Sequence, residues 1–183
     1  MSFIDPRGRD GKYIVDTIVT DFDVYEIGWN YSCDLFFMAG GNGKVNVYGY
    51  PSLQQECALN AHASHCYSLA FDPMGRYFAT GSADAIVSLW DLDTMACLRT
   101  FDKLVWPVRT ISISHDGQYL ASGAEDALID ISHVETGETV HSVKTSALTE
   151  NMSWHPSKHL LAYVGDDSSH GRYNGAFHVF GFK

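Results

Sequence analysis

The chain has 183 residues, of which 45% are hydrophobic and 19% are charged, and its formal net charge is −10. These values are ordinary for a folded domain with a sizeable core, and no apolar run approaches the roughly 18 residues of a membrane span. The acidic balance argues against direct binding of nucleic acid, because phosphate contacts are made by clustered Lys and Arg. The first residues, MSFIDPRGRDGKY, also lack the layout of a secretory signal. We therefore expect no membrane partner, a cytoplasmic or nuclear location, and contact with RNA only indirectly.

Four short phrases recur along the chain at a nearly fixed distance. They are IGWN, LAFDPMG, ISISHDG and MSWHPS, and their anchor residues are Trp29, Phe71, Ile113 and Trp154. Successive anchors are about 42 residues apart, and a period this regular indicates an internal repeat.

Each anchor phrase is followed by an apolar strand, small residues, a turn and another strand. These second phrases are LFFMAGGNGKVNVYGY from Leu35, RYFATGSADAIVSLWDL from Arg76, QYLASGAEDALIDISHV from Gln118 and HLLAYVGDD from His159. Asn42-Gly43 is a strong tight-hairpin signal, and Ala83-Asp84 and Glu125-Asp126 occupy the same place in their repeats. A less ordered strand closes each unit, and no helix-length amphipathic stretch interrupts the pattern. The sequence thus predicts an all-β chain with four strands in each period.

Four-stranded units at this period are typical of the blades of a β-propeller. A single blade cannot bury both faces of its sheet, so it must stack against its neighbours. We divide the chain into a half blade at 1–19, three blades at 20–61, 62–103 and 104–144, and a blade lacking its last strand at 145–183.

Both ends of the chain align with the middle of a repeat. SFID at residues 2–5 aligns with SLWD at 88–91, and AFHVFGFK at the other end aligns with a third strand. This pattern predicts seventeen strands, fewer than a seven-bladed propeller needs. We therefore expect the chain to be the C-terminal part of a longer propeller of seven four-stranded antiparallel blades.

The phrase FATGSADAIVSLWD at residues 78–91 resembles the repeats of the WD-repeat family. The resemblance implies a structural hydrogen-bonded set of His62, Thr80, Asp84 and Trp90 in the second full blade. Such a set is physically sensible, because an imidazole can link a turn carboxylate to a hydroxyl that accepts an indole N–H. The other blades depart from the pattern: the first has Met38, Asn42 and Tyr48, the third has Ser122, Asp126 and Ser132, and the fourth has Asp167 and Phe180. We expect one complete network and more reliance on apolar packing elsewhere.

No residues in the sequence predict catalysis, a cofactor or a metal. The Thr, His and Asp of the network suggest a nucleophilic triad, but Thr80 falls mid-strand and no nucleophile elbow is present. The string HASHC (His62, His65, Cys66) suggests zinc, yet a closed site needs four ligands and no second cluster matches it. The four cysteines form no CxxC pair, and free thiols are the expected state.

Two longer phrases, FDPMGRYFATGSAD and WPVRT, are similar to the WD-repeat subunits of THO complexes, which are nuclear assemblies that couple transcription to mRNA export. This resemblance implies a nuclear, non-enzymatic scaffold whose partners are the other THO complex subunits, with no small-molecule substrate. The alternative is a substrate-receptor propeller of a cullin-type ubiquitin ligase. Such receptors often carry Trp-Asp-x-Arg, whereas this chain has Trp90-Asp91-Leu92-Asp93.

Two loops are candidates for partner contact. In the first, Trp106-Pro107-Val108-Arg109 is expected to replace the usual His before the third full blade, and Trp106 and Arg109 are residue types typical of interface anchors. The alternative is that Trp106 fills a gap between blades. The second is the longer turn at 166–176, with His170, Arg172 and Tyr173. Its alternative is a solvated insertion without a partner.

Overall fold

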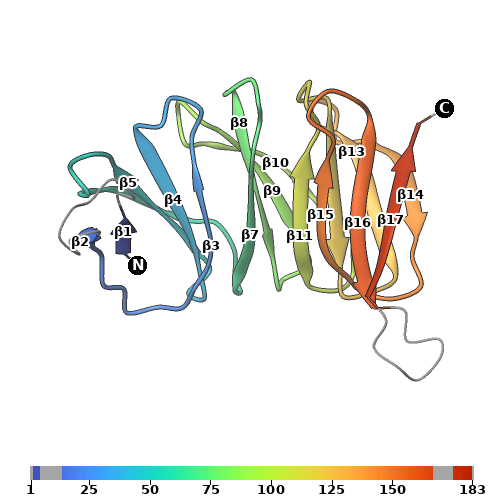
Figure 1. Cartoon of the computed structure of the whole chain (residues 1–183), viewed down its shortest axis with the longest axis horizontal. Coiled ribbons are helices and arrows are strands. Elements are labelled where there is room, and N and C mark those ends of the chain that lie inside the picture. Colours follow the sequence, from blue (N-terminus) through green and yellow to red (C-terminus); the bar gives the residue numbers. More distant parts are fainter. Residues whose placement is uncertain (1, 5–13, 167–174, 183) are drawn as a thin grey trace.

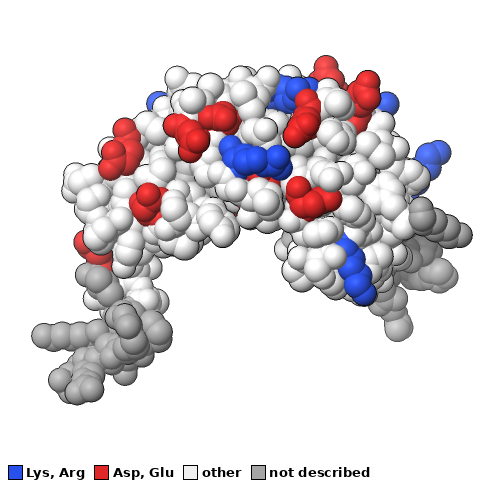
Figure 2. All heavy atoms as spheres, turned by 90° about the horizontal axis from the view of Figure 1, so that it is seen from above, with Lys and Arg blue, Asp and Glu red and all other residues white. Residues whose placement is uncertain are grey.

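The computed structural model describes residues 2–4, 14–166 and 175–182, and every regular element in these residues is a β-strand. The strands form sheets that stand side by side in chain order (Figure 1). Seen from above, the molecule follows an open arc (Figure 2). Within the described residues there is no helix of the length and apolar character needed to cross a membrane. The predicted all-β, partial-propeller fold is confirmed.

The seventeen strands of the described residues form five antiparallel sheets. β1 (Ser2–Ile4) pairs with β2 (Ile14–Thr17). The first four-stranded sheet contains β3 (Val24–Trp29), β4 (Leu35–Gly40), β5 (Lys44–Gly49) and β6 (Gln55–Asn60). The second contains β7 (Cys66–Phe71), β8 (Tyr77–Ser82), β9 (Val87–Asp91) and β10 (Cys97–Phe101). The third contains β11 (Val108–Ile113), β12 (Tyr119–Ala124), β13 (Leu128–His133) and β14 (Thr139–Lys144). The fourth contains β15 (Thr149–Trp154), β16 (Leu160–Asp166) and β17 (Gly175–Gly181).

The first strands of neighbouring sheets lie next to one another. β7 contacts both β3 and β11, and β11 also contacts β15. The sequence anchors Trp29, Phe71, Ile113 and Trp154 are the last residues of these four strands. The repeat found in the sequence is therefore the repeat of the fold. The blade boundaries assigned above remain our proposal for how the chain is divided.

The hydrophobic core lies between adjacent sheets rather than within one of them. Phe37 of the first sheet contacts Phe71 and Phe78 of the second, with ring centroids 5.0 Å apart in both pairs. A second cluster joins Leu89 of the second sheet to Ile111 of the third. The second strands of the three four-stranded sheets are buried on both faces, whereas the last strands β6, β10 and β14 are mostly exposed or half-buried. Each sheet thus needs its neighbours to bury its apolar face.

Small residues in β8 and β12 allow the sheets to approach closely. A Cβ atom on Gly81 would lie 2.9 Å from Val108 Cγ1, and one on Gly123 would lie 3.0 Å from Thr149 Cβ. The first distance is shorter than real Cβ atoms tolerate, and the second is tight enough that Thr149 would have to shift. The phrases ATGS and ASGA are therefore packing requirements, because the next sheet's first strand occupies the space of the missing side chain.

Candidate functional site

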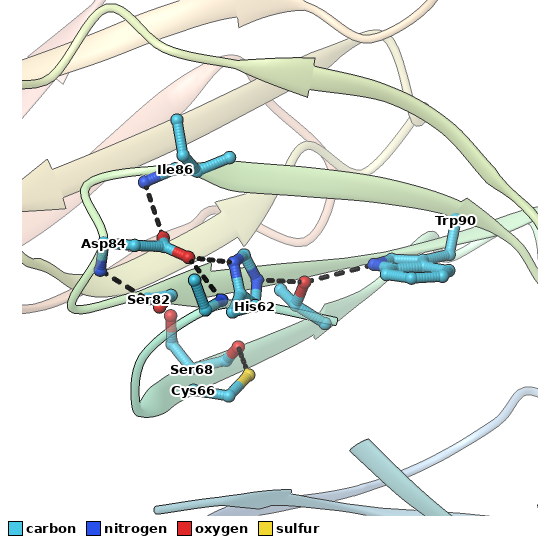
Figure 3. A network of polar contacts seen from close by, with 9 residues as sticks. His62, Cys66, Ser68, Ser82, Asp84, Ile86 and Trp90 are labelled. Atoms are coloured by element: carbon cyan, nitrogen blue, oxygen red, sulfur yellow. Dashed lines mark hydrogen bonds and ion pairs between the residues drawn. The ribbon is translucent and has the colours of Figure 1, made fainter. Parts of the chain in front are cut away.

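The structure brings His62, Thr80, Asp84 and Trp90 into one chain of hydrogen bonds in the second sheet (Figure 3). His62 Nδ1 lies 3.2 Å from Asp84 Oδ2, and His62 Nε2 lies 2.8 Å from Thr80 Oγ1. Trp90 Nε1 donates to Thr80 Oγ1 at 3.1 Å. All these contacts are satisfied when the imidazole is neutral, with Nδ1–H donating to Asp84 and Nε2 accepting from the Thr80 hydroxyl.

Burial sets the charge state of this network. Desolvation lowers the pKa of His62 below its usual value, although the carboxylate of Asp84 acts in the opposite direction. Asp84 also accepts backbone N–H bonds from Ala63 and Ile86, at 3.1 Å each. Thr80 is fully buried. A hydroxyl that no substrate can reach is not a nucleophile, so the geometry favours a structural role for these residues.

The third sheet lacks the network, and one detail of the sequence interpretation is wrong. His62 precedes the first residue of β7 by four positions, and the residue four positions before β11 is Leu104 rather than Trp106. Leu104 is only 5% exposed and packs in the core, so an apolar side chain replaces the imidazole. The buried Oδ1 of Asp126, at the position of Asp84, has no hydrogen-bond partner among the described residues.

The third sheet contains a different polar set that the sequence analysis missed. Asp130 in the middle of β13 is 1% exposed. Its carboxylate accepts hydrogen bonds from Ser132 Oγ at 2.6 Å and Ser142 Oγ at 3.5 Å. The signal in the sequence was an Asp between two isoleucines in a buried strand, where only a hydrogen-bonded carboxylate is tolerated.

One residue near the start of each first strand is skipped in the pairing with the second strand. The register shifts between Val24 and Glu26, Cys66 and Ser68, Val108 and Thr110, and Thr149 and Asn151. The skipped residues are Tyr25, Tyr67, Arg109 and Glu150, which we call the bulge row. A β-bulge redirects a side chain out of the regular sheet and often does so at functional sites.

Three members of the bulge row form a continuous contact across three sheets. The rings of Tyr25 and Tyr67 meet edge to face with centroids 5.0 Å apart. The Arg109 guanidinium lies 4.4 Å from the centroid of the Tyr67 ring. Arg109 Nε also donates to Glu125 at 2.8 Å. The sequence analysis identified Arg109 but missed the two tyrosines, although all three occupy the same position of the repeat.

Trp106 lies exposed in the loop that enters the third sheet. Its side chain is 54% exposed, and the neighbouring Val105 is 78% exposed. A side chain that is more than half exposed does not fill a gap between sheets, and Leu104 occupies the buried position instead. The second candidate loop, with His170, Arg172 and Tyr173, lies outside the described residues.

The HASHC string does not form a metal site. The His62 ring is occupied by Asp84 and Thr80, and His65 Nδ1 lies 3.0 Å from Tyr25 Oη. Burial, helped by Asp84 and Glu26, raises the pKa of Cys66 to about 12, so this thiol stays protonated. In the described part of the chain, one group of three metal-ligand residue types lies close together, namely His115, Asp116 and His159. His115 and Asp116 come after the end of β11, and His159 comes directly before β16, far along the chain from HASHC.

Comparison with known proteins identifies the repeat. A family model described as "WD domain, G-beta repeat" matches residues 53–91, and one described as "Anaphase-promoting complex subunit 4 WD40 domain" matches residues 102–157. Among solved structures, one titled "Structure of U3-55K" superposes with a TM-score of 0.77 at 13% identity, covering 87% of this chain and 53% of that chain. At this identity the likeness supports the fold alone.

Two curated relatives are similar in sequence. "THO complex subunit 3" of Arabidopsis thaliana is 51% identical over 166 residues, which is 89% of this chain and 52% of the relative. "WD repeat-containing protein AAC3" of Dictyostelium discoideum is 34% identical over 165 residues, which is 87% of this chain and 34% of the relative. The chain thus spans about half, or less, of the length of these relatives.

Proposed function

This chain belongs to the WD-repeat β-propeller family, and we propose that it is a non-enzymatic scaffold subunit of a nuclear THO complex, which couples transcription to mRNA processing and export. The observation that carries the proposal is the 51% identity over 166 residues with THO complex subunit 3 of Arabidopsis thaliana. The same similarity favours this function over a substrate receptor of a cullin-type ubiquitin ligase.

The proposed partners are the other THO complex subunits, bound through protein surface. A propeller suits this role because rigid sheets hold loops and bulged residues at fixed positions. The net charge of −10 supports indirect rather than direct contact with RNA. Figure 2 agrees with this, since acidic side chains lie along the arc with basic ones between them and no continuous basic patch crosses the visible face.

We place the partner-binding surface on the bulge row and the neighbouring Trp106 loop. Tyr, Trp and Arg are the residue types that dominate binding energy at protein interfaces. Here Tyr67 contacts both Tyr25 and Arg109, so the three side chains span three sheets. Trp106 lies exposed three positions before Arg109. The ring contact and the Glu125 pair hold the Arg109 guanidinium in place. A preorganised side chain loses less conformational entropy when a partner binds.

The test is affinity purification of the tagged full chain from a nuclear extract of its own organism, followed by mass spectrometry. Recovery of the other THO subunits is expected. Trp106→Ala and Arg109→Glu should each reduce that recovery by about tenfold or more, the effect of losing an interface anchor. Tyr31→Ala and Lys158→Glu are matched controls, because both change exposed residues in the turns that follow β3 and β15, at the other end of the first strands from the bulge row.

The outcomes separate the two parts of the proposal. Recovery of a cullin and its adaptor instead of THO subunits contradicts the scaffold function. Recovery of THO subunits that is unchanged by both Trp106→Ala and Arg109→Glu leaves the function standing and contradicts the bulge-row surface. The thermal melting curve of each variant shows whether a loss of recovery comes from unfolding.

A further inference from the structure

Three side chains with metal-binding chemistry meet at the junction between the third and fourth sheets. His115 and Asp116 follow the end of β11, and His159 immediately precedes β16. β11 and β15 are neighbours in the arc, so the turns that follow these two strands come together (Figure 1). One ligand atom from each of His115, Asp116 and His159 lies within 4.8 Å of the other two. This is the one such group in the described ranges 2–4, 14–166 and 175–182.

Hydrogen bonds fix the orientation of the Asp116 carboxylate, so that one of its oxygens faces His159. Its Oδ1 accepts hydrogen bonds from Ser114 Oγ at 2.6 Å and from the Gln118 backbone N–H at 3.1 Å. Its Oδ2 is directed at His159 Nε2, 2.8 Å away. Metal-binding carboxylates are commonly held in this way, with one oxygen fixed by the protein so that the other faces the ion.

His115 is the second imidazole of the cluster, and in the described residues its contacts give no other role for the ring. Its ring centroid lies 4.9 Å from that of His159. Its Nδ1 is buried, and the described residues give it no hydrogen-bond partner. A buried polar nitrogen without a partner costs free energy, which a bound ligand would recover.

We propose that His115, Asp116 and His159 form a binding site for a divalent transition-metal ion such as Zn²⁺. Two imidazoles and one carboxylate form a ligand set suited to Zn²⁺, and a water molecule completes four-coordination. Ligand atoms around tetrahedral Zn²⁺ at 2.0–2.2 Å are about 3.4 Å apart. The three side chains therefore close by a small rotation of the half-buried rings, and the ion replaces the hydrogen bond between Asp116 and His159. Bound there, the ion would join the third sheet to the fourth.

The repeat itself shows that this site is not a general feature of the blades. The turn after the first strand has the same length in each sheet, so positions can be compared directly. At the junction of the second and third sheets, the three positions hold Pro73, Met74 and Gln118. None of these three residues carries an imidazole or a carboxylate. That junction is closed instead by Arg76, which pairs with Asp72 at 2.8 Å and reaches the Gly117 carbonyl at 3.5 Å.

Isothermal titration of the metal-free full chain with ZnCl₂ tests the proposal. One equivalent of Zn²⁺ should bind and raise the melting temperature, whereas Mg²⁺, which prefers oxygen ligands, should not. His115→Gln and His159→Gln should each weaken Zn²⁺ affinity at least about tenfold, since even indirect partners of a metal site have effects of this size. His155→Gln is the matched control, because His155 lies in the same turn as His159 but outside the cluster.

The variants keep the test independent of folding. The described residues give the His115 ring no hydrogen bond to lose, and Gln at 159 can still donate to Asp116. Their metal-free melting temperatures show whether the sheets remain packed. A second measurement is the visible absorption of bound Co²⁺, whose bands depend on its ligands. Bands typical of nitrogen ligation that appear in the wild type and are lost in His115→Gln support the site. Absence of one-to-one Zn²⁺ binding, or equal affinity in the wild type and both cluster variants, overturns the proposal and leaves only a hydrogen bond between Asp116 and His159.

Discussion

The second and third sheets have the same architecture and different polar interiors. Both have four antiparallel strands, a bulge at the second residue of the first strand, and a close-packed glycine in the second strand. The second sheet contains the linked set from Asp84 through His62 and Thr80 to Trp90. The third has a buried leucine in place of the histidine and a serine in place of the tryptophan.

The comparison separates what determines the fold from what stabilises one copy of it. Because both sheets form, the shared features of apolar packing between sheets, small residues and turn length are sufficient for the blade geometry. The hydrogen-bonded network is therefore a local source of stability in the second sheet. In the third sheet, Asp130 with its two serines is a separate solution to burying polar groups.

Of the substitutions that distinguish the two sheets, Trp90→Ala should lower the free energy of unfolding most. Trp90 is 7% exposed and stacks on Phe78 with ring centroids 5.9 Å apart. Removing a large buried aromatic side chain should lower the free energy of unfolding by roughly 3–5 kcal/mol. The measurement is urea denaturation followed by far-UV circular dichroism. Ser132→Ala, at the same position of the third sheet, should cost only about 1–2 kcal/mol because it removes one hydrogen bond to Asp130.

An equal loss of stability in Trp90→Ala and Ser132→Ala would contradict the distinction between the two sheets. An unchanged unfolding curve for Trp90→Ala would show that the indole is not a core element.

Thr80→Val tests the hydrogen bonds of the network without changing its volume. The substitution leaves Trp90 Nε1 and His62 Nε2 buried without their partner. We expect a loss of about 1–3 kcal/mol, the usual cost of unsatisfied buried groups. Ser122→Ala at the matching position should cost less than about 1 kcal/mol, because Ser122 makes only a long contact of 3.5 Å to the Asp130 carbonyl. Equal effects in denaturant titrations of the two variants would show that the network adds nothing.

Much of the fold was predictable because the features that define the repeat lie within short segments of the sequence. The regular period, the tight turns and the anchors at the ends of the first strands all depend on short segments. The four residues of the second-sheet network were also recognisable, since they occupy the family's motif positions.

The contacts between sheets could not be predicted in the same way. His115 and Asp116 lie a full repeat before His159 in the chain, and nothing local to either turn indicates that they meet. The WPVR phrase was expected to replace the histidine of the third sheet, but β11 begins at Val108, so Leu104 occupies that position, two residues before Trp106. The tyrosines of the bulge row look like ordinary strand residues until the pairing shows that they are skipped.

The pH dependence of stability should differ between the wild type and His62→Gln. The folded-state pKa of His62 lies below its usual value of 6.5, because burial disfavours the charged imidazole. When pH falls below about 6.5, the unfolded chain binds this proton before the folded chain does, so folding stability decreases. Above that pH the contribution is fully present. Urea midpoints between pH 7.5 and about 5 should fall more steeply for the wild type than for His62→Gln. Parallel curves would mean that His62 is as easily protonated in the folded chain as in the unfolded one.

The smallest predicted effect on stability comes from replacing Cys66, the first residue of β7. Val108 is the corresponding first residue of β11 in the third sheet. Cys66 is fully buried and its pKa is raised to about 12, while Cys33 and Cys97 are exposed. The thiolate is the reactive form, so iodoacetamide at pH 8 should label Cys33 and Cys97 in the native protein and Cys66 only after denaturation. Cys66→Val should leave the melting temperature nearly unchanged, since Val108 fills the same position with no exposed surface. Labelling of Cys66 in the native protein as fast as that of Cys33 or Cys97 would mean that the junction between β3 and β7 opens in solution, and it would contradict a firmly packed interface between the first and second sheets.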